Sequence, residues 1–181
     1  MTVDKEVGPI RIVDYDPKWP RRFEREADRI RSALTDRVLR VEHVGSTAVP
    51  DLPAKPIIDI VLVVADSTKE AEYAGPLEEI GYRLHIREPG WHEHRLFRGP
   101  EGDVNLHVFS ASCPEIGRML ALRDWLRTCE GDRELYAGAK RALARREWEC
   151  IEEYADAKTG VIEEILSRAR PGVPRRGDAA R

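Results

Sequence analysis

The sequence predicts an α+β domain with a helical C-terminal third, on three observations. Residues 57–64 form a nearly continuous run of β-branched and aliphatic side chains, typical of a strand covered on both faces. Short β-like segments follow in residues 82–109, separated by turns that contain Gly and Pro. From residue 116 to residue 168, apolar residues recur at helical spacing. With 181 residues, the chain has the length of one ordinary domain, which we assign to residues 1–170.

The first part of the chain predicts a strand followed by a helix. A short strand is expected over residues 10–13, closed by a turn. Asp16 followed by Pro17 is typical of a helix start. The apolar residues that follow Trp19 at helical spacing are Phe23, Ala27, Ile30 and Leu34. This periodicity predicts an amphipathic helix that packs on a sheet.

The middle of the chain predicts two strands and a second helix. Residues 38–44 alternate as a strand does and end in a Gly-Ser-Thr turn. A connection containing three prolines leads to the strand at residues 57–64. Ser67 is expected to cap a helix that reaches residue 80, because Gly81 stands where a C-terminal glycine belongs.

The remaining elements complete the predicted order. Strands are expected at residues 82–86, 94–98 and 104–109, and helices at residues 116–128, 132–154 and 156–168. Residues 171–181 carry no apolar periodicity and are expected to be a disordered tail.

Composition excludes several classes of protein. Thirty Lys and Arg against 33 Asp and Glu give a net charge of −3, which argues against a non-specific nucleic-acid binder but leaves a local basic cleft open. Three cysteines are too few for a disulfide framework, and their odd number fits a reducing compartment. The N-terminus has no apolar core of a signal peptide, and the longest apolar run is far too short to span a bilayer. We expect a soluble, cytoplasmic protein without membrane contact, whose oligomeric state the sequence leaves open.

The densest cluster of chemically capable residues lies between residues 41 and 64. Gly45 would let the backbone approach a ligand, and the hydroxyls of Ser46 and Thr47 could contact phosphate oxygens. Lys55 offers a point charge for a polyphosphate. Asp59 interrupts an apolar strand, where a carboxylate is costly unless it meets a cation, a donor or a metal. An ordinary turn and a structurally satisfied carboxylate explain the same residues equally well.

Other polar residues allow both a site role and an ordinary structural one. Arg95 could hold a phosphate or a carboxylate bidentately, or lie exposed on an edge strand. The His-Glu-His run at residues 92–94 has no third ligand at a recognisable spacing, so a surface strand or loop is favoured. Glu42 and His43 precede the turn, as candidate acid or base groups or as a surface carboxylate and a core histidine.

Residues 42–60, EHVGSTAVPDLPAKPIIDI, resemble the signature of the GrpB-like family, a group with the nucleotidyltransferase fold. The later segments NLHVF, LRDWLR, LYAGAKRALA and YADAKTGVIEEIL resemble further blocks of the same family. The resemblance implies a nucleotidyltransferase-like mixed sheet flanked by helices. Relatives of this family also occur fused to dephospho-coenzyme A kinase, but the chain has no G-x-x-x-x-G-K-[ST] loop.

The resemblance also implies a site. Nucleotidyltransferases typically follow a Gly-Ser element with acids that hold two divalent ions. Asp59 stands at the first acid, with Mg²⁺ or Mn²⁺ as the expected cofactor, whereas Val61 stands at the second and cannot bind a metal. At the third, the candidates are Asn105 and His107, with His107 as the candidate catalytic residue beside Asp59.

The implied function is binding of a nucleotide or another phosphorylated small molecule, with transfer of a nucleotidyl group by a divalent metal. The alternative is a non-catalytic binding or folding-accessory module that has lost part of its acid set. The cationic residues of the family's helical blocks could form a basic wall over the cleft or could pair with acids along their own helices: Arg123, Arg127, Lys140 and Lys158.

Overall fold

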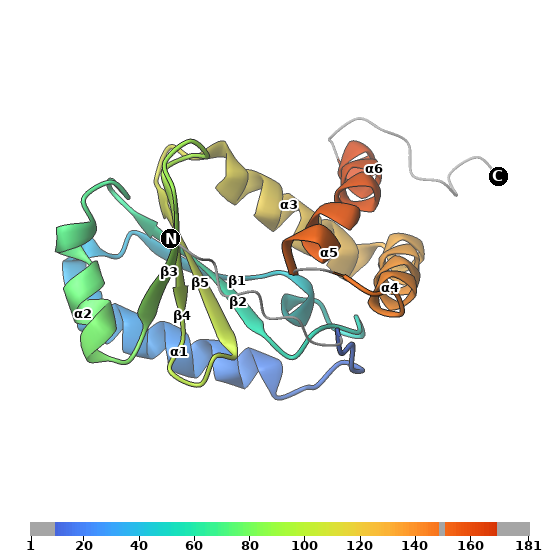
Figure 1. Cartoon of the computed structure of the whole chain (residues 1–181), viewed down its shortest axis with the longest axis horizontal. Coiled ribbons are helices and arrows are strands. Elements are labelled where there is room, and N and C mark those ends of the chain that lie inside the picture. The colour runs from blue at the N-terminus through green and yellow to red at the C-terminus, as the bar shows by residue number, and fades with distance from the viewer. Residues whose placement is uncertain (1–9, 149–150, 170–181) are drawn as a thin grey trace.

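The computed structural model describes residues 10–148 and 151–169, and its centre is a five-stranded mixed sheet with strand order β1-β2-β5-β4-β3 (Figure 1). The central pair, β2 and β5, runs parallel, and every other neighbouring pair runs antiparallel. The strands are β1 (Arg40–Val44), β2 (Ile58–Val64), β3 (Arg83–Glu88), β4 (His94–Arg98) and β5 (Val104–Ser110). The predicted α+β class is therefore confirmed.

Two groups of helices cover opposite faces of this sheet (Figure 1). On one face lie α1 (Trp19–Leu34) and α2 (Ala74–Glu79), and on the other α3 (Pro114–Thr128) connects the sheet to the remaining helices. These are α4 (Glu130–Ala144), α5 (Ile151–Ala157) and α6 (Thr159–Ala169). The predicted helical C-terminal third is present.

Successive side chains of β2 and β5 point to opposite faces of the sheet, so each strand contributes to the core on both faces. Ile60 and Leu106 belong to the main core under α1, whereas Val61 and Phe109 pack with Ile116 of α3. Because β2 is buried on both sides, its sequence is apolar throughout except for Asp59.

The amphipathic character of α1 follows the predicted spacing. Its four predicted apolar residues are all buried against the sheet. The helix begins at Trp19, two residues after Pro17, because the Asp16 carboxylate accepts a hydrogen bond from the Lys18 amide at 2.9 Å and closes a turn before the helix.

Three predicted elements differ from the structure. The expected strand at residues 10–13 reduces to one antiparallel bridge between Val13 and Ala54. Ser67 does not cap a helix; its hydroxyl donates to the Glu93 carbonyl oxygen at 2.9 Å, and α2 begins only at Ala74. The helix expected over residues 132–154 is divided into α4 and α5, and the Trp148 indole donates to the Leu143 carbonyl oxygen at 2.8 Å near the end of α4.

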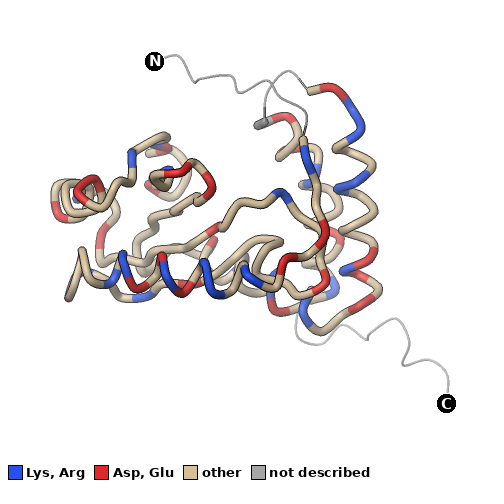
Figure 2. Tube along the Cα trace, turned by 90° about the horizontal axis from the view of Figure 1, so that it is seen from below, with Lys and Arg blue, Asp and Glu red and all other residues tan. Residues whose placement is uncertain are grey.

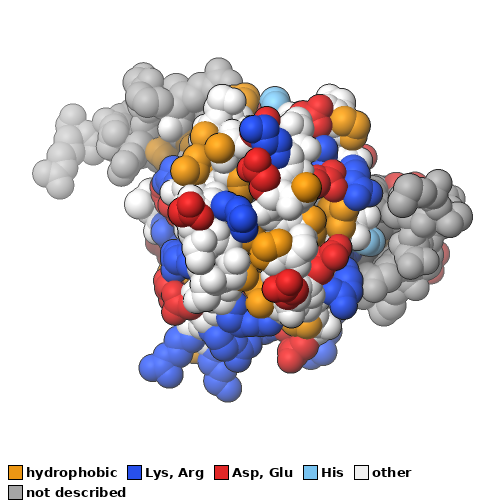
Figure 3. Space-filling model, turned by 90° about the vertical axis from the view of Figure 1, so that its left-hand side faces the viewer, with side chains coloured by type: hydrophobic (Ala, Val, Ile, Leu, Met, Phe, Trp, Pro, Cys, Tyr) orange, Lys and Arg blue, Asp and Glu red, His pale blue; other side chains and the backbone are white. Residues whose placement is uncertain are grey.

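The surface mixes charges of both signs. Basic and acidic positions are interspersed along the trace in Figure 2, and Figure 3 shows apolar, acidic and basic side chains intermixed on one face. Within the described residues, no helix is both long and apolar enough to cross a bilayer. The predicted tail, residues 171–181, lies outside the described residues.

Candidate functional site

The turn after β1 brings Gly45 against the side chain of Asp59. Gly45 has φ 71° and ψ −172°, a backbone conformation that is essentially restricted to glycine. A Cβ atom at this position would lie 2.6 Å from the Asp59 Oδ2 atom. Glycine is therefore required twice, for its backbone conformation and for close approach to this carboxylate. Ser46 follows at the start of a 3₁₀ turn, Ser46–Ala48.

Asp59 is positioned by the parallel pairing of β2 and β5, which places it beside Asn105. The Asn105 amide nitrogen donates to Asp59 Oδ1 at 3.0 Å, and His107 Nε2 lies 3.6 Å from the same oxygen. Burial raises the pKa of the Asp59 carboxyl, but His107, Asn105 and the charge of Lys158 outweigh burial and hold this pKa below its usual value. The group is thus an anion in a partly buried setting.

Two lysines of the C-terminal helices reach the same region. Lys140 of α4 donates to Ser46 Oγ at 2.7 Å and to the Pro53 carbonyl oxygen, and its Nζ lies 4.7 Å from the centre of the Tyr136 ring. Burial and the charge of Lys158 lower the Lys140 pKa to about 7. Burial also lowers the pKa of Lys158, although Asp59 opposes this effect. Both amines therefore carry a desolvation cost that an anion would relieve.

Two adjoining hollows lie between the sheet and the helical part. The larger has a volume of about 380 Å³ and extends from Gly45 toward α3 and α6. The smaller, of about 190 Å³, is lined by three lysines, Lys55, Lys140 and Lys158, against one carboxylate, Asp59. The hollows are lined in common by Ser46, Asp59, Asn105, Ala155 and Lys158, so they adjoin, and we call the two together the lysine cavity.

Most residues singled out in the sequence meet at the lysine cavity. The residues that line it are Gly45, Ser46, Thr47, Lys55, Asp59 and His107. Thr47 is buried, and its hydroxyl already contacts His43 Nε2 at 3.0 Å and donates to the Ile57 carbonyl oxygen at 3.3 Å. Its contribution is to hold the turn in place.

Arg95 is not brought to this group. It pairs across the sheet with Val108, whose side chain faces α1, whereas His107 faces α3. Arg95 instead donates to Glu70 at 2.6 Å and to Glu93 at 3.2 Å. The phosphate-contact role expected for Arg95 therefore has no support in the geometry, because alternation sends its side chain to the opposite face.

Glu42 and His43 separate across β1. Glu42 faces α3 and forms an ion pair with Arg123 at 2.8 Å, and Arg123 also donates to the His43 carbonyl oxygen at 3.0 Å. The His43 ring is buried and stacks on Phe23 with 4.8 Å between ring centres. Burial lowers the His43 pKa to about 4. His43 is a core histidine.

The sequence leaves two interpretations open for the lysines of the C-terminal part. Lys140 and Lys158 stand in charged, helix-forming segments where surface pairing is the usual role. Their burial depends on how α4, α5 and α6 fold back over the Gly45 turn, which helical periodicity does not encode. Arg127, in turn, donates to the Ala48 carbonyl oxygen at 2.9 Å and holds the 3₁₀ turn.

The donor set of the lysine cavity does not fit a resident divalent ion. Val61 is fully buried at the second acid's position, and Asn105 presents its nitrogen rather than its oxygen to Asp59. Lys158 directs a positive charge at the same carboxylate. Among the residues that the structure describes, no group of three His, Cys, Asp or Glu side chains is placed to hold a metal ion. Divalent ions prefer several oxygen ligands, whereas Asp59 accepts a hydrogen bond from the Asn105 amide and faces the charge of Lys158.

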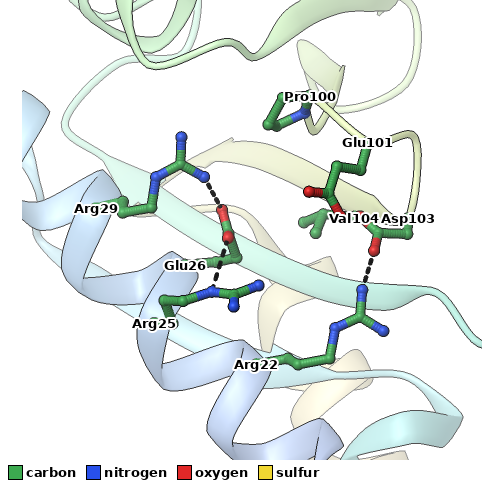
Figure 4. A pocket seen from close by; sticks show the side chains of 8 residues that line it. All are labelled: Arg22, Arg25, Glu26, Arg29, Pro100, Glu101, Asp103 and Val104. Carbon is green, nitrogen blue, oxygen red and sulfur yellow. Dashed lines mark hydrogen bonds and ion pairs between the residues drawn. The ribbon is translucent and has the colours of Figure 1, made fainter.

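A further hollow, of about 380 Å³, lies on the other face between α1 and the turn that joins β4 to β5 (Figure 4). Its arginines already have carboxylate partners: Arg22 pairs with Asp103, and Arg25 and Arg29 pair with Glu26 at 3.6 and 2.7 Å (Figure 4). Charge there is locally balanced, in contrast to the lysine cavity.

The fold is nucleotidyltransferase-like. A structure of Cid1 that concerns its RNA terminal uridylyl transferase activity aligns with a TM-score of 0.55 over 75% of this chain and 42% of that protein. The two are 12% identical, so this likeness concerns the fold alone.

The sequence itself shows the family. Residues 9–168 match the GrpB protein family, and the chain belongs to this family. It is 58% identical to the UPF0157 protein BH1888 of Halalkalibacterium halodurans over 88% of this chain and 82% of that protein. The crystal structure of the conserved protein GrpB from Enterococcus faecalis aligns with a TM-score of 0.78 and 34% identity, over 88% of this chain and 96% of that one. A dephospho-CoA kinase of Mycobacterium tuberculosis is 32% identical over 90% of this chain but only 46% of the kinase.

Proposed function

We propose that the lysine cavity binds a nucleotide or a similar phosphorylated small molecule. The observation that carries this proposal is the local excess of positive charge beside the Gly45 turn, where three lysines face one carboxylate. Ser46 Oγ and the Lys140 amine, 2.7 Å apart, would contact phosphate oxygens together.

The energetics of the lysines support an anionic ligand. A pKa of about 7 means that the folded chain resists the charged form of Lys140. A phosphate in the cavity would pair with this ammonium and with Lys158, and would remove part of the cost of burying both. Binding and protonation are therefore expected to support each other.

Transfer of a nucleotidyl group is the reaction proposed for the bound nucleotide. The nucleotidyltransferase-like fold supports this class of reaction, although fold alone does not establish activity. In this proposal the lysines, rather than a resident metal, neutralise the polyphosphate, while Asp59 and His107 lie beside it.

The test is thermal denaturation of the full chain with ATP, UTP and inorganic triphosphate, all in the presence of a chelator. A ligand at 100 times its Kd stabilises the folded state by about 2.7 kcal/mol. We expect stabilisation of wild type and of Lys69→Met, an exposed control that lies outside the cavity, but not of Lys158→Met. Stabilisation of all three proteins alike would place the ligand elsewhere, and stabilisation of none would refute the proposal.

A second candidate function is that of a binding or folding-accessory module without catalysis. Two points favour it: the resemblance to nucleotidyltransferases places a metal-binding acid where this chain has the buried Val61, and a related sequence makes up about half of a dephospho-CoA kinase. Incubation with α-labelled nucleotides and candidate acceptors separates the two candidates. Binding without any transfer of label supports the accessory module.

A further inference from the structure

A chain of four side chains leads from the surface to the lysine cavity across four strands. Glu88 Oε2 on β3 lies 2.6 Å from His94 Nδ1 on β4. His94 Nε2 lies 3.1 Å from His107 Nδ1 on β5, and His107 Nε2 lies 3.6 Å from Asp59 Oδ1 on β2. Glu88 is 44% exposed at one end, and the cavity lies at the other.

Packing holds the two imidazole rings in place. The His94 ring stacks on His107 with 5.2 Å between centres and on Phe109 at 4.8 Å. The Trp91 ring meets His94 edge-on at 5.1 Å. Because His94 is only 3% exposed, its ring cannot turn without disturbing its neighbours.

The hydrogen-bond partners of the two imidazole rings determine which tautomer each ring adopts. An ionised Glu88 carboxylate only accepts hydrogen bonds, so the proton of a neutral His94 stands on Nδ1. His94 Nε2 is then bare and must accept from His107, so His107 Nδ1 carries a proton. Burial and the neighbouring His107 lower the His94 pKa, and this keeps His94 neutral. The one ring nitrogen left without an assigned proton is His107 Nε2, which faces Asp59 and the cavity.

We propose that Glu88 and His94 form a relay that fixes the tautomer of His107, so that His107 Nε2 is the proton acceptor and donor of the lysine cavity. This inference rests on the proposed function, which supplies the proton. The acceptor's hydroxyl oxygen bonds to the α-phosphorus, the bond from that phosphorus to its bridging oxygen breaks, and diphosphate leaves with the electron pair. The hydroxyl proton goes to His107 Nε2, and the resulting imidazolium pairs with Asp59. Glu88 and His94 are positioning residues, since neither touches the substrate.

Charged groups from every neighbouring element act on this pair of rings. Glu88 on β3 and Arg95 on β4 act on His94, and Asp59 on β2 faces His107. Lys158 before α6 and Glu115 and Arg118 on α3 line the same hollow as His107. Arg118 pairs with Glu115 at 3.0 Å, which limits the net effect of α3. Asp59 Oδ1, 3.6 Å away, is the charged atom that faces His107 Nε2.

The experiment is ¹⁵N nuclear magnetic resonance of the full chain labelled at histidine, without any ligand. In wild type we expect the neutral Nδ1–H form of His94 and a proton on His107 Nδ1. Glu88→Gln removes the carboxylate at the surface end, and we expect the His94 and His107 ring nitrogens to shift together. Glu79→Gln removes an equivalent exposed charge from α2, outside the relay, and should leave both rings unchanged.

An Nε2–H tautomer of His94 in wild type would overturn the proposal, even if no variant could be studied. So would identical His107 signals in the Glu88→Gln and Glu79→Gln proteins. Because the spectra need no ligand, a relay that fails and a cavity that binds no nucleotide are separate results.

Discussion

Replacing Gly45 with alanine tests how closely the turn and Asp59 are fitted. Alanine at position 45 would have to adopt a backbone conformation that is restricted to glycine, with φ 71°, at a cost of about 1–3 kcal/mol. It would also lie 2.6 Å from Asp59 Oδ2, so the carboxylate must move and its 3.0 Å hydrogen bond from Asn105 is lost. Losing a hydrogen bond to a charged group adds about 1.5–3 kcal/mol.

The structure offers a matched control for this substitution. Gly102 has φ 73° and no atom within 4 Å of an added Cβ, so Gly102→Ala carries backbone strain without the contact. In urea unfolding, we expect Gly45→Ala to lose about 2 kcal/mol more than Gly102→Ala. The excess should shrink in an Asp59→Ala background, because the nearest atom, Asp59 Oδ2, is gone while the Cβ at 3.1 Å stays. Equal losses for the two glycine variants in the wild-type background would refute the close fit.

Three further predictions concern charge. His43 has a pKa of about 4 against an ordinary value near 6.5, so the stability that its neutral ring contributes is present above pH 6.5 and falls by about 3 kcal/mol as the pH drops toward 4. In urea unfolding, the free energy of unfolding of His43→Phe should therefore fall less steeply with decreasing pH than that of wild type. Equal pH dependence of the two proteins would contradict this. Triphosphate binding at pH 8 should take up protons, because the anion raises the pKa of Lys140 from about 7; calorimetry in two buffers of different ionisation enthalpy measures the uptake, which Lys140→Met should reduce. Asp59→Asn should lose about 1–3 kcal/mol of stability equally with chelator and with Mn²⁺, since the carboxylate accepts a hydrogen bond from Asn105 rather than holding a metal; Mn²⁺ stabilisation of wild type alone would restore the metal site.

The sequence predicts well the strands whose apolar residues form a clear pattern. The strand β4 begins and ends where the sequence places it, and β2 differs by one residue. The short strand at residues 10–13 fails because a single bridge to Ala54 is all the pairing it finds. Where tertiary hydrogen bonds compete with local signals, as at Ser67, the local signal is the one that fails.

The candidate site shows the same division. The Gly45 turn and Asp59 come together because the strands that carry them are neighbours in the sheet. The side chain of Arg95 lies on the other face of the sheet from the site. Which residues of β4 point to each face depends on the register of β4 with β5, and a shift of one residue would exchange them. Lys140 reaches Ser46 from a segment 94 residues away, so no spacing in the sequence reveals this contact. Glu88 and His94 are only six residues apart, but their pairing depends on the register of β3 with β4.

The most direct test of the account is calorimetric titration of the full chain with UTP and inorganic triphosphate in the presence of a chelator. The account predicts one site per chain, with affinity reduced about 10- to 100-fold in Lys158→Met, the loss expected for one charged hydrogen bond. Lys69→Met should bind as wild type does. Binding that appears only when Mg²⁺ or Mn²⁺ is added, or that is unchanged in Lys158→Met, would contradict the claim that lysines hold the anion.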